Sequence, residues 1–203
     1  MEEKRRHSTA AAAFNRMRER ETKASDHQCH PRASTVDDDK DKAIVAVCNS
    51  VIRGRRASPA ASRLYKLHMA DQETQKLVKL AQDMRARAYC NYSKVRVGAA
   101  LLCEDGTIFT GCNVENASYG LTICAERTAL VKAVSEGHRT FKAIAVASNM
   151  NDLTMPCGAC RQFIIEFGKN IVVHSAAADG RVSSKRADEL LPLSFGASDL
   201  PPK

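Results

Sequence analysis

The 203-residue sequence has no apolar run that approaches the roughly eighteen residues a membrane-spanning helix requires. Hydrophobic residues still make up 44% of the chain and charged residues 27%, which is enough for a core and a polar surface. We therefore expect a soluble protein that does not enter a membrane, with one domain of ordinary size and an appendage.

A disulfide framework is also missing. The eight cysteines do not follow the spacing of small secreted domains, and three of them belong to the motif described below. This use of cysteine fits a reducing, intracellular compartment, and we expect the protein to be cytoplasmic.

The second part of the chain lacks an excess of positive charge. The formal net charge is +8, but residues 1–70 carry a net +6 and residues 71–203 only +2. Proteins that follow a nucleic-acid backbone depend on many lysine and arginine contacts to phosphates. A nucleic-acid partner is therefore not expected, and a small-molecule substrate is favoured.

Residues 1–70 are polar and compositionally biased, and we predict that they form a disordered, basic N-terminal extension. Targeting to an organelle is the alternative. Transit peptides are poor in acidic residues, whereas this segment carries Glu2, Glu3, Glu19 and Glu21.

Residues 71–203 alternate helical and strand patterns and are predicted to form the folded domain. Apolar residues from Leu77 to Ala88 recur at helical spacing behind Asp71, which can cap that helix. Such alternation predicts an α/β fold in which helices cover both faces of a sheet. The expected elements are a helix from Asp71, strands Val95–Cys103 and Thr107–Cys112, a helix Cys124–Glu136, a strand Phe141–Ser148, a helix Cys157–Phe167, strands Ile171–Ser175 and Arg181–Lys185, and a short helix Asp188–Leu191.

Two cysteine motifs carry the chemistry. The segment Cys124-Ala125-Glu126-Arg127 is followed, after the 28 residues 128–155, by Pro156-Cys157-Gly158-Ala159-Cys160. Three thiolates would hold Zn²⁺ and leave the fourth tetrahedral position to water, as in catalytic zinc sites. The carboxylate of Glu126 can reach that water without ligating the metal. We therefore predict a catalytic zinc site with Cys124, Cys157 and Cys160 as ligands and Glu126 as the acid/base.

A lone Cys-x-x-Cys motif more often belongs to a structural zinc ribbon or a redox pair. A ribbon would need a second closely spaced ligand pair, but only Cys112 lies near Cys124. A redox pair would leave Glu126 without a role. Both cysteine motifs fall at predicted helix starts, where backbone N–H groups stabilise negative charge. Arg127 is predicted to offset the remaining thiolate charge from outside the ligand shell.

From Asp71 to Leu200 the chain resembles the small, homotetrameric, three-cysteine cytidine deaminases. Zinc nucleobase deaminases share the pattern of a ligand, one residue, Glu and a later Pro-Cys-x-x-Cys. The segments that carry the resemblance are Ala88–Ser93, Val97–Leu101, Gly111–Tyr119, Cys124–Ala129, Pro156–Gln162 and Glu189–Pro192. The resemblance implies that the fold is a three-layer α/β/α sandwich with a mixed sheet of about five strands, and that residues 71–203 are the catalytic domain.

The resemblance also implies roles for individual residues. The three cysteines match the ligands of one Zn²⁺ per chain, and Glu126 matches the acid that protonates the pyrimidine N3. The backbone N–H of Ala125 matches a donor to the pyrimidine 2-oxygen. Asn113 and Glu115 match the pair that binds the ribose hydroxyls, although polar residues after a strand are by themselves more often turn formers.

Two aromatic residues, Tyr119 and Phe195, match side chains that line or close the pocket across subunits, which implies a homotetramer with shared active sites. Val95 stands where many relatives carry an aromatic residue against the pyrimidine, and Met155 stands where a serine often precedes the Pro-Cys motif. These two departures concern substrate binding and not the zinc chemistry.

The function expected from these residues and this resemblance is hydrolytic deamination of cytidine and 2′-deoxycytidine in pyrimidine salvage. One alternative is a deaminase of an aminoacylated nucleoside such as blasticidin S, against which Glu115 favours a ribose diol. The others are a polynucleotide-editing deaminase and a structural zinc protein with residues 1–70 as an interaction arm.

Overall fold

The computed structural model describes residues 59–201. By internal contacts the chain divides into the units Met1–Asn49 and Ser50–Lys203, and everything described here belongs to the second. Most of the predicted N-terminal extension therefore lies outside the described residues. None of the described helices is long and apolar enough to cross a membrane.

A five-stranded sheet with the strand order β2-β1-β3-β4-β5 forms the centre of the domain. Strand β1 runs antiparallel to both β2 and β3, β3 and β4 are parallel, and β4 and β5 are antiparallel. The mixed sheet of about five strands is confirmed. The strands are β1 Val97–Cys103, β2 Ile108–Cys112, β3 Phe141–Ser148, β4 Val172–Ala176 and β5 Val182–Arg186.

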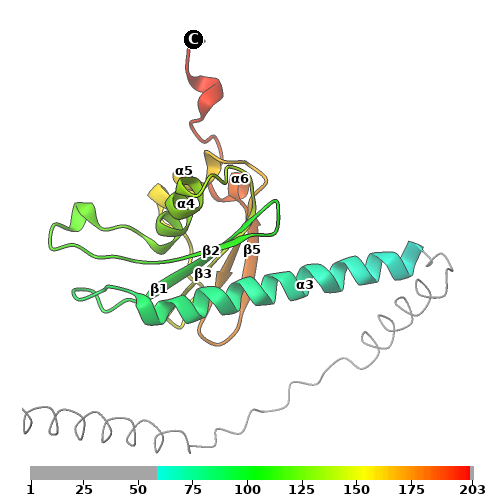
Figure 1. Cartoon of the computed structure of the whole chain (residues 1–203), viewed down its shortest axis with the longest axis horizontal. Helices are drawn as coiled ribbons and strands as arrows, with labels where there is room; N and C mark the ends of the chain where they lie inside the picture. The colour runs from blue at the N-terminus through cyan, green and yellow to red at the C-terminus, as the bar shows by residue number, and fades with distance from the viewer. Residues whose placement is uncertain (1–58, 202–203) are drawn as a thin grey trace, which may run out of the picture. The chain divides into compact units, whose positions relative to one another are not determined.

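Helices cover both faces of the sheet, which confirms the predicted three-layer fold (Figure 1). Side chains alternate along β1: Leu101 packs toward the layer of α4, α5 and α6, while Leu102 packs toward α3. The helical segments are α3 Pro59–Met84, η1 Arg85–Arg87, η2 Tyr119–Leu121, α4 Ala125–Ser135, α5 Gly158–Ile165, α6 Ala187–Leu190 and η3 Ala197–Asp199.

Two glycines let helices approach the sheet closely. A Cβ atom at Gly111 of β2 would lie 2.5 Å from the carbonyl oxygen of Ala125 and 2.5 Å from the amide nitrogen of Ala129. A Cβ atom at Gly98 of β1 would lie 2.1 Å from the carbonyl oxygen of Ala81. Helix α4 therefore rests directly on β2, and its first turn is fixed relative to the sheet.

Helix α3 begins at Pro59, and the predicted start at Asp71 is wrong. The added segment is rich in Ala, Leu, Lys, Arg and Met, which favour helix by intrinsic propensity, and proline suits the first helical position. Its Leu64 and Leu67 are exposed, and Leu77 is the first of its described side chains that is buried. The periodic pattern used for the prediction reports burial against the sheet, so it missed the part of α3 that extends beyond it (Figure 1).

Strand β1 starts at Val97 and not at the predicted Val95. Lys94 adopts a left-handed conformation with φ of 60°, and the carboxamide of Asn113 hydrogen-bonds the backbone at Val95 and Val97. A side chain thus takes the place of a neighbouring strand at this point.

Candidate active site

The N-termini of α4 and α5 meet at a group of three cysteines. Cys124 is the N-cap of α4, Cys157 is the N-cap of α5, and Cys160 lies in the first turn of α5. The sulfur atoms of Cys124 and Cys157 are 3.8 Å apart, and all three sulfurs lie within 4.8 Å of one another. The structure therefore brings together the three residues predicted to bind the metal.

This group fits a zinc ion. Zinc–sulfur bonds of about 2.3 Å in a tetrahedron place two sulfur ligands about 3.8 Å apart, which matches the Cys124–Cys157 distance. Thiolates are ligands that zinc prefers, and two helix N-termini direct positive dipole ends at their negative charge. Cys157 is exposed and Cys160 is buried, so the site opens to solvent on one side only.

Glu126 lies in the first turn of α4, one residue beyond Ala125, and is only 3% exposed. Burial raises the pKa of the Glu126 carboxyl group to about 7, and the negative charge of Cys124 adds to the shift. A carboxyl group with this pKa can both accept and release a proton near neutral pH, as an acid/base catalyst must.

Arg127 contacts the cysteine group from the side. Its Nη2 donates to the carbonyl oxygen of Thr122 at 3.1 Å and to the sulfur of Cys124 at 3.6 Å. A hydrogen bond from Cys160 lowers the pKa of the Cys124 thiol, and Arg127 lowers it further. The hydrogen bond to Cys124 and burial both raise the pKa of the Cys160 thiol. The predicted position of Arg127 outside the ligand shell agrees with these contacts.

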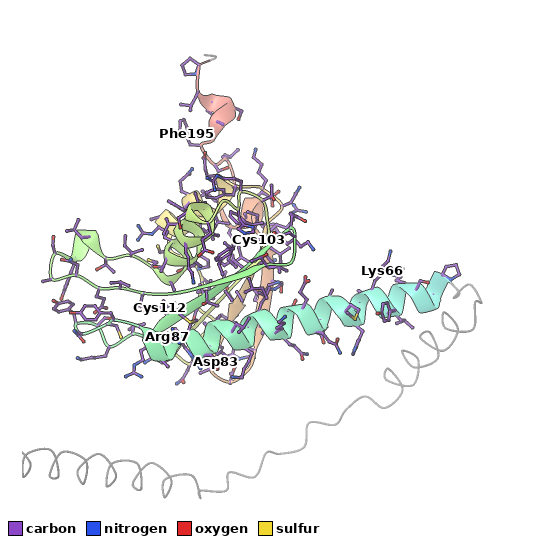
Figure 2. The ribbon with its side chains drawn as sticks, viewed as in Figure 1. Lys66, Asp83, Arg87, Cys103, Cys112 and Phe195 are labelled. Atoms are coloured by element: carbon purple, nitrogen blue, oxygen red, sulfur yellow. The ribbon has the colours of Figure 1, made fainter. Side chains whose placement is uncertain are left out.

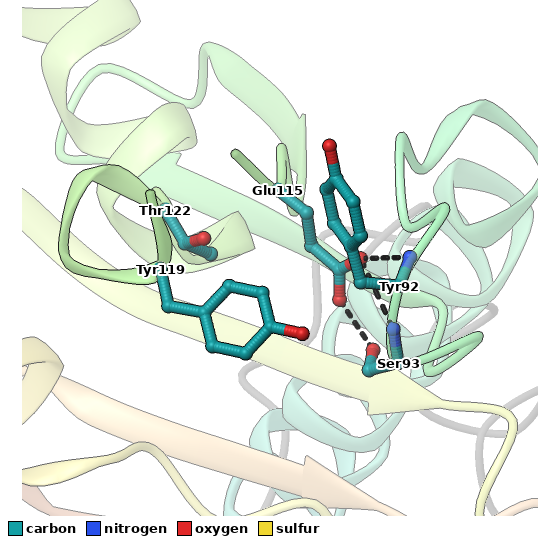
Figure 3. A pocket seen from close by; sticks show the side chains of 5 residues that line it. All are labelled: Tyr92, Ser93, Glu115, Tyr119 and Thr122. Carbon is teal, nitrogen blue, oxygen red and sulfur yellow. Dashed lines mark hydrogen bonds between the residues drawn. The ribbon is translucent and has the colours of Figure 1, made fainter. Parts of the chain in front are cut away.

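A pocket of about 320 Å³ lies between the turn of Tyr92 and Ser93 and the segment from Tyr119 to Thr122 (Figure 3). Thr122, whose carbonyl oxygen Arg127 contacts, is one of the residues that line it. An isolated β-bridge between Val114 and Ile123 holds the backbone next to Glu115 against the segment that leads into Cys124. The pocket is lined by Tyr92, Ser93, Glu115, Tyr119 and Thr122.

The turn that contains Tyr92 and Ser93 holds the side chain of Glu115 in the pocket wall across from Thr122. Its Oε2 accepts hydrogen bonds from the backbone N–H groups of Tyr92 at 2.8 Å and Ser93 at 3.2 Å, and its Oε1 accepts one from the Ser93 hydroxyl (Figure 3). These bonds, that of the Ser93 hydroxyl first, hold the pKa of the Glu115 carboxyl group below its usual value. Glu115 therefore presents an ionised carboxylate in a fixed orientation.

Asn113 directly follows β2 and Val95 lies two residues before β1, and a hydrogen bond joins them. The Asn113 Nδ2 donates to the carbonyl oxygen of Val95 at 2.8 Å, and its Oδ1 accepts from the N–H of Val97 at 2.9 Å. Asn113 is 8% exposed and Val95 is half-buried, and neither is among the residues that line the pocket. Two of the four hydrogen-bonding positions of the Asn113 carboxamide are thus used to shape the backbone.

The remaining predicted residues take different positions. Ala125 is buried and is the first residue of α4, where its N–H group has no acceptor within the helix. Tyr119 lines the pocket and is 73% exposed. Phe195 lies in the C-terminal segment after α6, is 60% exposed and lines no part of this pocket (Figure 2). Met155 is exposed before the buried Pro156.

Sequence reasoning assigned no role to Tyr92, Ser93 and Thr122, although Tyr92 and Ser93 stood in one of the matching segments. Tyr92 and Ser93 contact Glu115 because an isolated β-bridge pairs Tyr89 with Val114. No spacing in the sequence predicts this bridge. The sequence signal that could have indicated this pocket wall is the run of polar and aromatic residues just before the first strand.

Comparison with known proteins agrees with this geometry. The family model of the cytidine and deoxycytidylate deaminase zinc-binding region matches residues 71–175. A probable cytidine deaminase of Dictyostelium discoideum is 52% identical over 133 residues, covering 65% of this chain and 90% of that relative. A blasticidin-S deaminase of Bacillus cereus is less similar, with 28% identity over 137 residues, 64% of this chain and 91% of that relative.

Solved structures lead to the same family. The crystal structure of cytidine deaminase from Burkholderia pseudomallei is 48% identical, with a TM-score of 0.58, and the match covers 60% of this chain and 98% of that chain. By the extent of the family model and the identity to its relatives, this chain is an enzyme of the cytidine and deoxycytidylate deaminase family.

Proposed function

We propose that this protein hydrolytically deaminates cytidine and 2′-deoxycytidine to uridine and 2′-deoxyuridine with release of ammonia, and so serves pyrimidine salvage. The observation that carries the proposal is the buried Glu126, which lies in the first turn of α4, two residues beyond Cys124, one of three converging cysteines. The names of the most similar relatives support the choice of cytidine as substrate.

Cys124, Cys157 and Cys160 would hold one Zn²⁺ per chain. When bound there, zinc supplies a lowered pKa for water, so that a hydroxide nucleophile is available near neutral pH. Glu126 takes the proton that water loses and delivers protons to N3 of the ring and to the departing amine. Oxygen bonds to C4 and the C4–N4 bond breaks. One of the two water protons stays on N3 of uridine, and the other completes the ammonia that leaves.

The substrate is held by groups on both sides of the cysteines. The free N–H of Ala125 at the start of α4 is suited to donate to the pyrimidine 2-oxygen. Glu115 is suited to accept from the ribose hydroxyls, because an ionised carboxylate offers about four acceptor sites and three are used by the turn. Asn113 can contribute one remaining N–H, and Tyr119 can cover the sugar or base.

We propose a homotetramer in which active sites are shared. Large exposed apolar side chains gather around the pocket and on the C-terminal segment, and burying them between subunits would complete a site that is open in one chain. Phe195 is the candidate to close a neighbouring pocket, since it does not line the pocket of Glu115 and Tyr119 in its own chain. The exposed residues are Tyr92, Tyr119, Leu121, Leu193 and Phe195.

We further propose that the enzyme works in the cytoplasm. All six cysteines of the described part are free thiols, among them the three that would bind zinc. A reducing compartment keeps them available.

A single assay tests the proposed reaction. The purified full chain, with its zinc content measured, is incubated with cytidine, 2′-deoxycytidine, blasticidin S and a cytosine-containing oligonucleotide, and ammonia is measured. Release from the two nucleosides alone is expected, and the Glu126→Gln variant serves as the matched inactive control. Release only from blasticidin S or only from the oligonucleotide would replace the proposed substrate.

A further inference from the structure

A second group of possible metal ligands lies at the opposite end of α4 from the cysteine site. It consists of Cys103, the last residue of β1, Asp105 in the turn between β1 and β2, and His138 just beyond α4. One ligand atom from each of the three side chains lies within 4.8 Å of the others. Helix α4 has eleven residues and so spans about 16 Å, which separates this group from Cys124.

The spacing within the group suits a small transition-metal ion. The Nδ1 atom of His138 and the Oδ2 atom of Asp105 are 3.3 Å apart, longer than the usual 2.9–3.0 Å of an N–H···O hydrogen bond. Bonds of about 2.0–2.2 Å from tetrahedral zinc to nitrogen and oxygen place two such ligands about 3.3 Å apart. The distance, which is also that of a histidine–aspartate ion pair, suits two ligands on one metal.

The histidine is held in place by the end of α4. Gly137 has a φ of 98°, its N–H donates to the carbonyl oxygen of Val134 at 3.1 Å, and the N–H of His138 donates to that of Ala133 at 3.0 Å. These two bonds form a Schellman motif, which fixes the direction in which the chain leaves the helix. The ring of Phe109 packs edge-on against the imidazole, with centroids 5.0 Å apart.

The other two ligands are equally constrained. The Oδ1 atom of Asp105 accepts a hydrogen bond from the N–H of Thr107 at 2.9 Å, which leaves Oδ2 directed at His138. The side chain of Cys103 is buried at 1% exposure beneath them. The carboxylate is half exposed, so an ion can enter from solvent and keep water as a further ligand.

We propose that Cys103, Asp105 and His138 form a second, surface-accessible site for a divalent transition-metal ion such as Zn²⁺. The donor set of one thiolate, one imidazole and one carboxylate is one that zinc accepts, and its two negative charges balance the ion. Bound metal would tie the β1–β2 turn to the C-terminal end of α4. This site does not depend on the proposed reaction.

The test adds Co²⁺ to the full-length protein already loaded with one equivalent of zinc, and follows the thiolate-to-cobalt absorption. The sequence carries further possible ligands at His27, Cys29 and His30, so the readout is a comparison of variants. Cys103→Ser removes the sulfur, while His138→Gln and Asp105→Asn remove surface ligands. The matched control is Cys112→Ser, whose thiol donates to the carbonyl oxygen of Arg87 toward the opposite end of the sheet (Figure 2).

We expect absorption in the unmodified chain and in Cys112→Ser, its loss in Cys103→Ser, and apparent affinity at least about tenfold weaker in the two surface variants. No absorption at millimolar Co²⁺ in the unmodified chain, or full absorption in Cys103→Ser, would overturn the proposal. If Cys103→Ser does not fold, His138→Gln decides: unchanged affinity there overturns the proposal and a tenfold loss supports it.

Discussion

The Glu126 carboxyl group is held where its ionised form is poorly solvated. Its pKa in the folded chain is raised to about 7 from 4.5, so in metal-free protein the unfolded chain releases its proton first. The contribution of Glu126 to the free energy of unfolding is therefore fully present below pH 4.5 and is lost as the pH rises to about 7. Above pH 7 it stays lost. The difference corresponds to at most about 3 kcal/mol.

Replacing Glu126 with Gln should therefore have opposite effects on stability and activity. With zinc removed by a chelator, Glu126→Gln should be more stable than the unmodified chain at pH 8, by on the order of 1–3 kcal/mol, and about equal to it at pH 4.5. Urea unfolding at both pH values measures this. The zinc-loaded variant should lose deamination by several orders of magnitude. Equal stability of the two proteins at pH 8 would show that burial does not strain this carboxyl group.

Arg127 offers a second test at the residue scale. Because its guanidinium contacts the sulfur of Cys124, Arg127→Gln should weaken zinc binding by about 10–100-fold, the usual effect of removing a group that supports a ligand. Competition with a chromophoric chelator gives the affinity. Arg181→Gln, an exposed arginine paired with Asp179, is the control and should leave zinc affinity unchanged. An equal loss in both variants would point to net charge and not to the Cys124 contact.

At the scale of elements, the contact between α4 and β2 decides whether the cysteines and Glu126 meet. A side chain at Gly111 has no room between the strand and the backbone of α4, with atoms at 2.5 Å. Gly111→Ala should therefore cost at least about 1–3 kcal/mol of stability and, by displacing the first turn of α4, lower kcat/KM. Denaturant midpoints and initial rates measure the two effects.

The matched control for this substitution is Gly120→Ala. Gly120 lies in η2, and an added Cβ atom there would meet nothing within 4 Å. Its stability should stay within about 0.5 kcal/mol of the unmodified chain. If Gly111→Ala were as well tolerated as Gly120→Ala, α4 would not be held against β2 by the missing side chain.

Several elements could be predicted because their ends are decided locally. Gly137 and Gly168 end α4 and the turn that follows α5 with positive φ, as the sequence indicated, and the β1–β2 turn lies at Asp105 and Gly106. The start of α3 at Pro59 could not be derived from burial, because Leu64, Leu67 and Met69 are exposed and give no periodic buried pattern. In this segment the helix is explained by the intrinsic helix propensity of its residues.

At the scale of the whole molecule, the cysteine spacing predicted which sulfurs meet, because each motif begins a helix and both helices pack on the same face. The pocket was less predictable: Tyr92 and Ser93 reach Glu115 through a contact across more than twenty residues of sequence. The role of Phe195 is the hardest to predict from the sequence, because a role in a neighbouring subunit depends on surfaces that one chain does not contain.

The predicted boundary between the extension and the catalytic domain, at residues 70 and 71, falls inside α3 and gives the last prediction. Among the described side chains of α3, the first buried ones are Leu77 and Val78. A chain beginning at Asp71 therefore loses, of the described side chains, only exposed or half-exposed ones. Its unfolding free energy should stay within about 1 kcal/mol of the full chain, with unchanged kcat/KM.

A chain beginning at Lys79 is the contrast, because it removes both buried side chains and should lose at least about 2–5 kcal/mol, enough to unfold much of a marginally stable domain. Light scattering after size-exclusion chromatography would compare the assembly of the two truncated chains with that of the full chain. Loss of the proposed tetramer on removal of residues 1–70 alone would mean that Leu64, Leu67 and Met69, exposed in a single chain, are buried between subunits, and the domain boundary would then move toward Pro59.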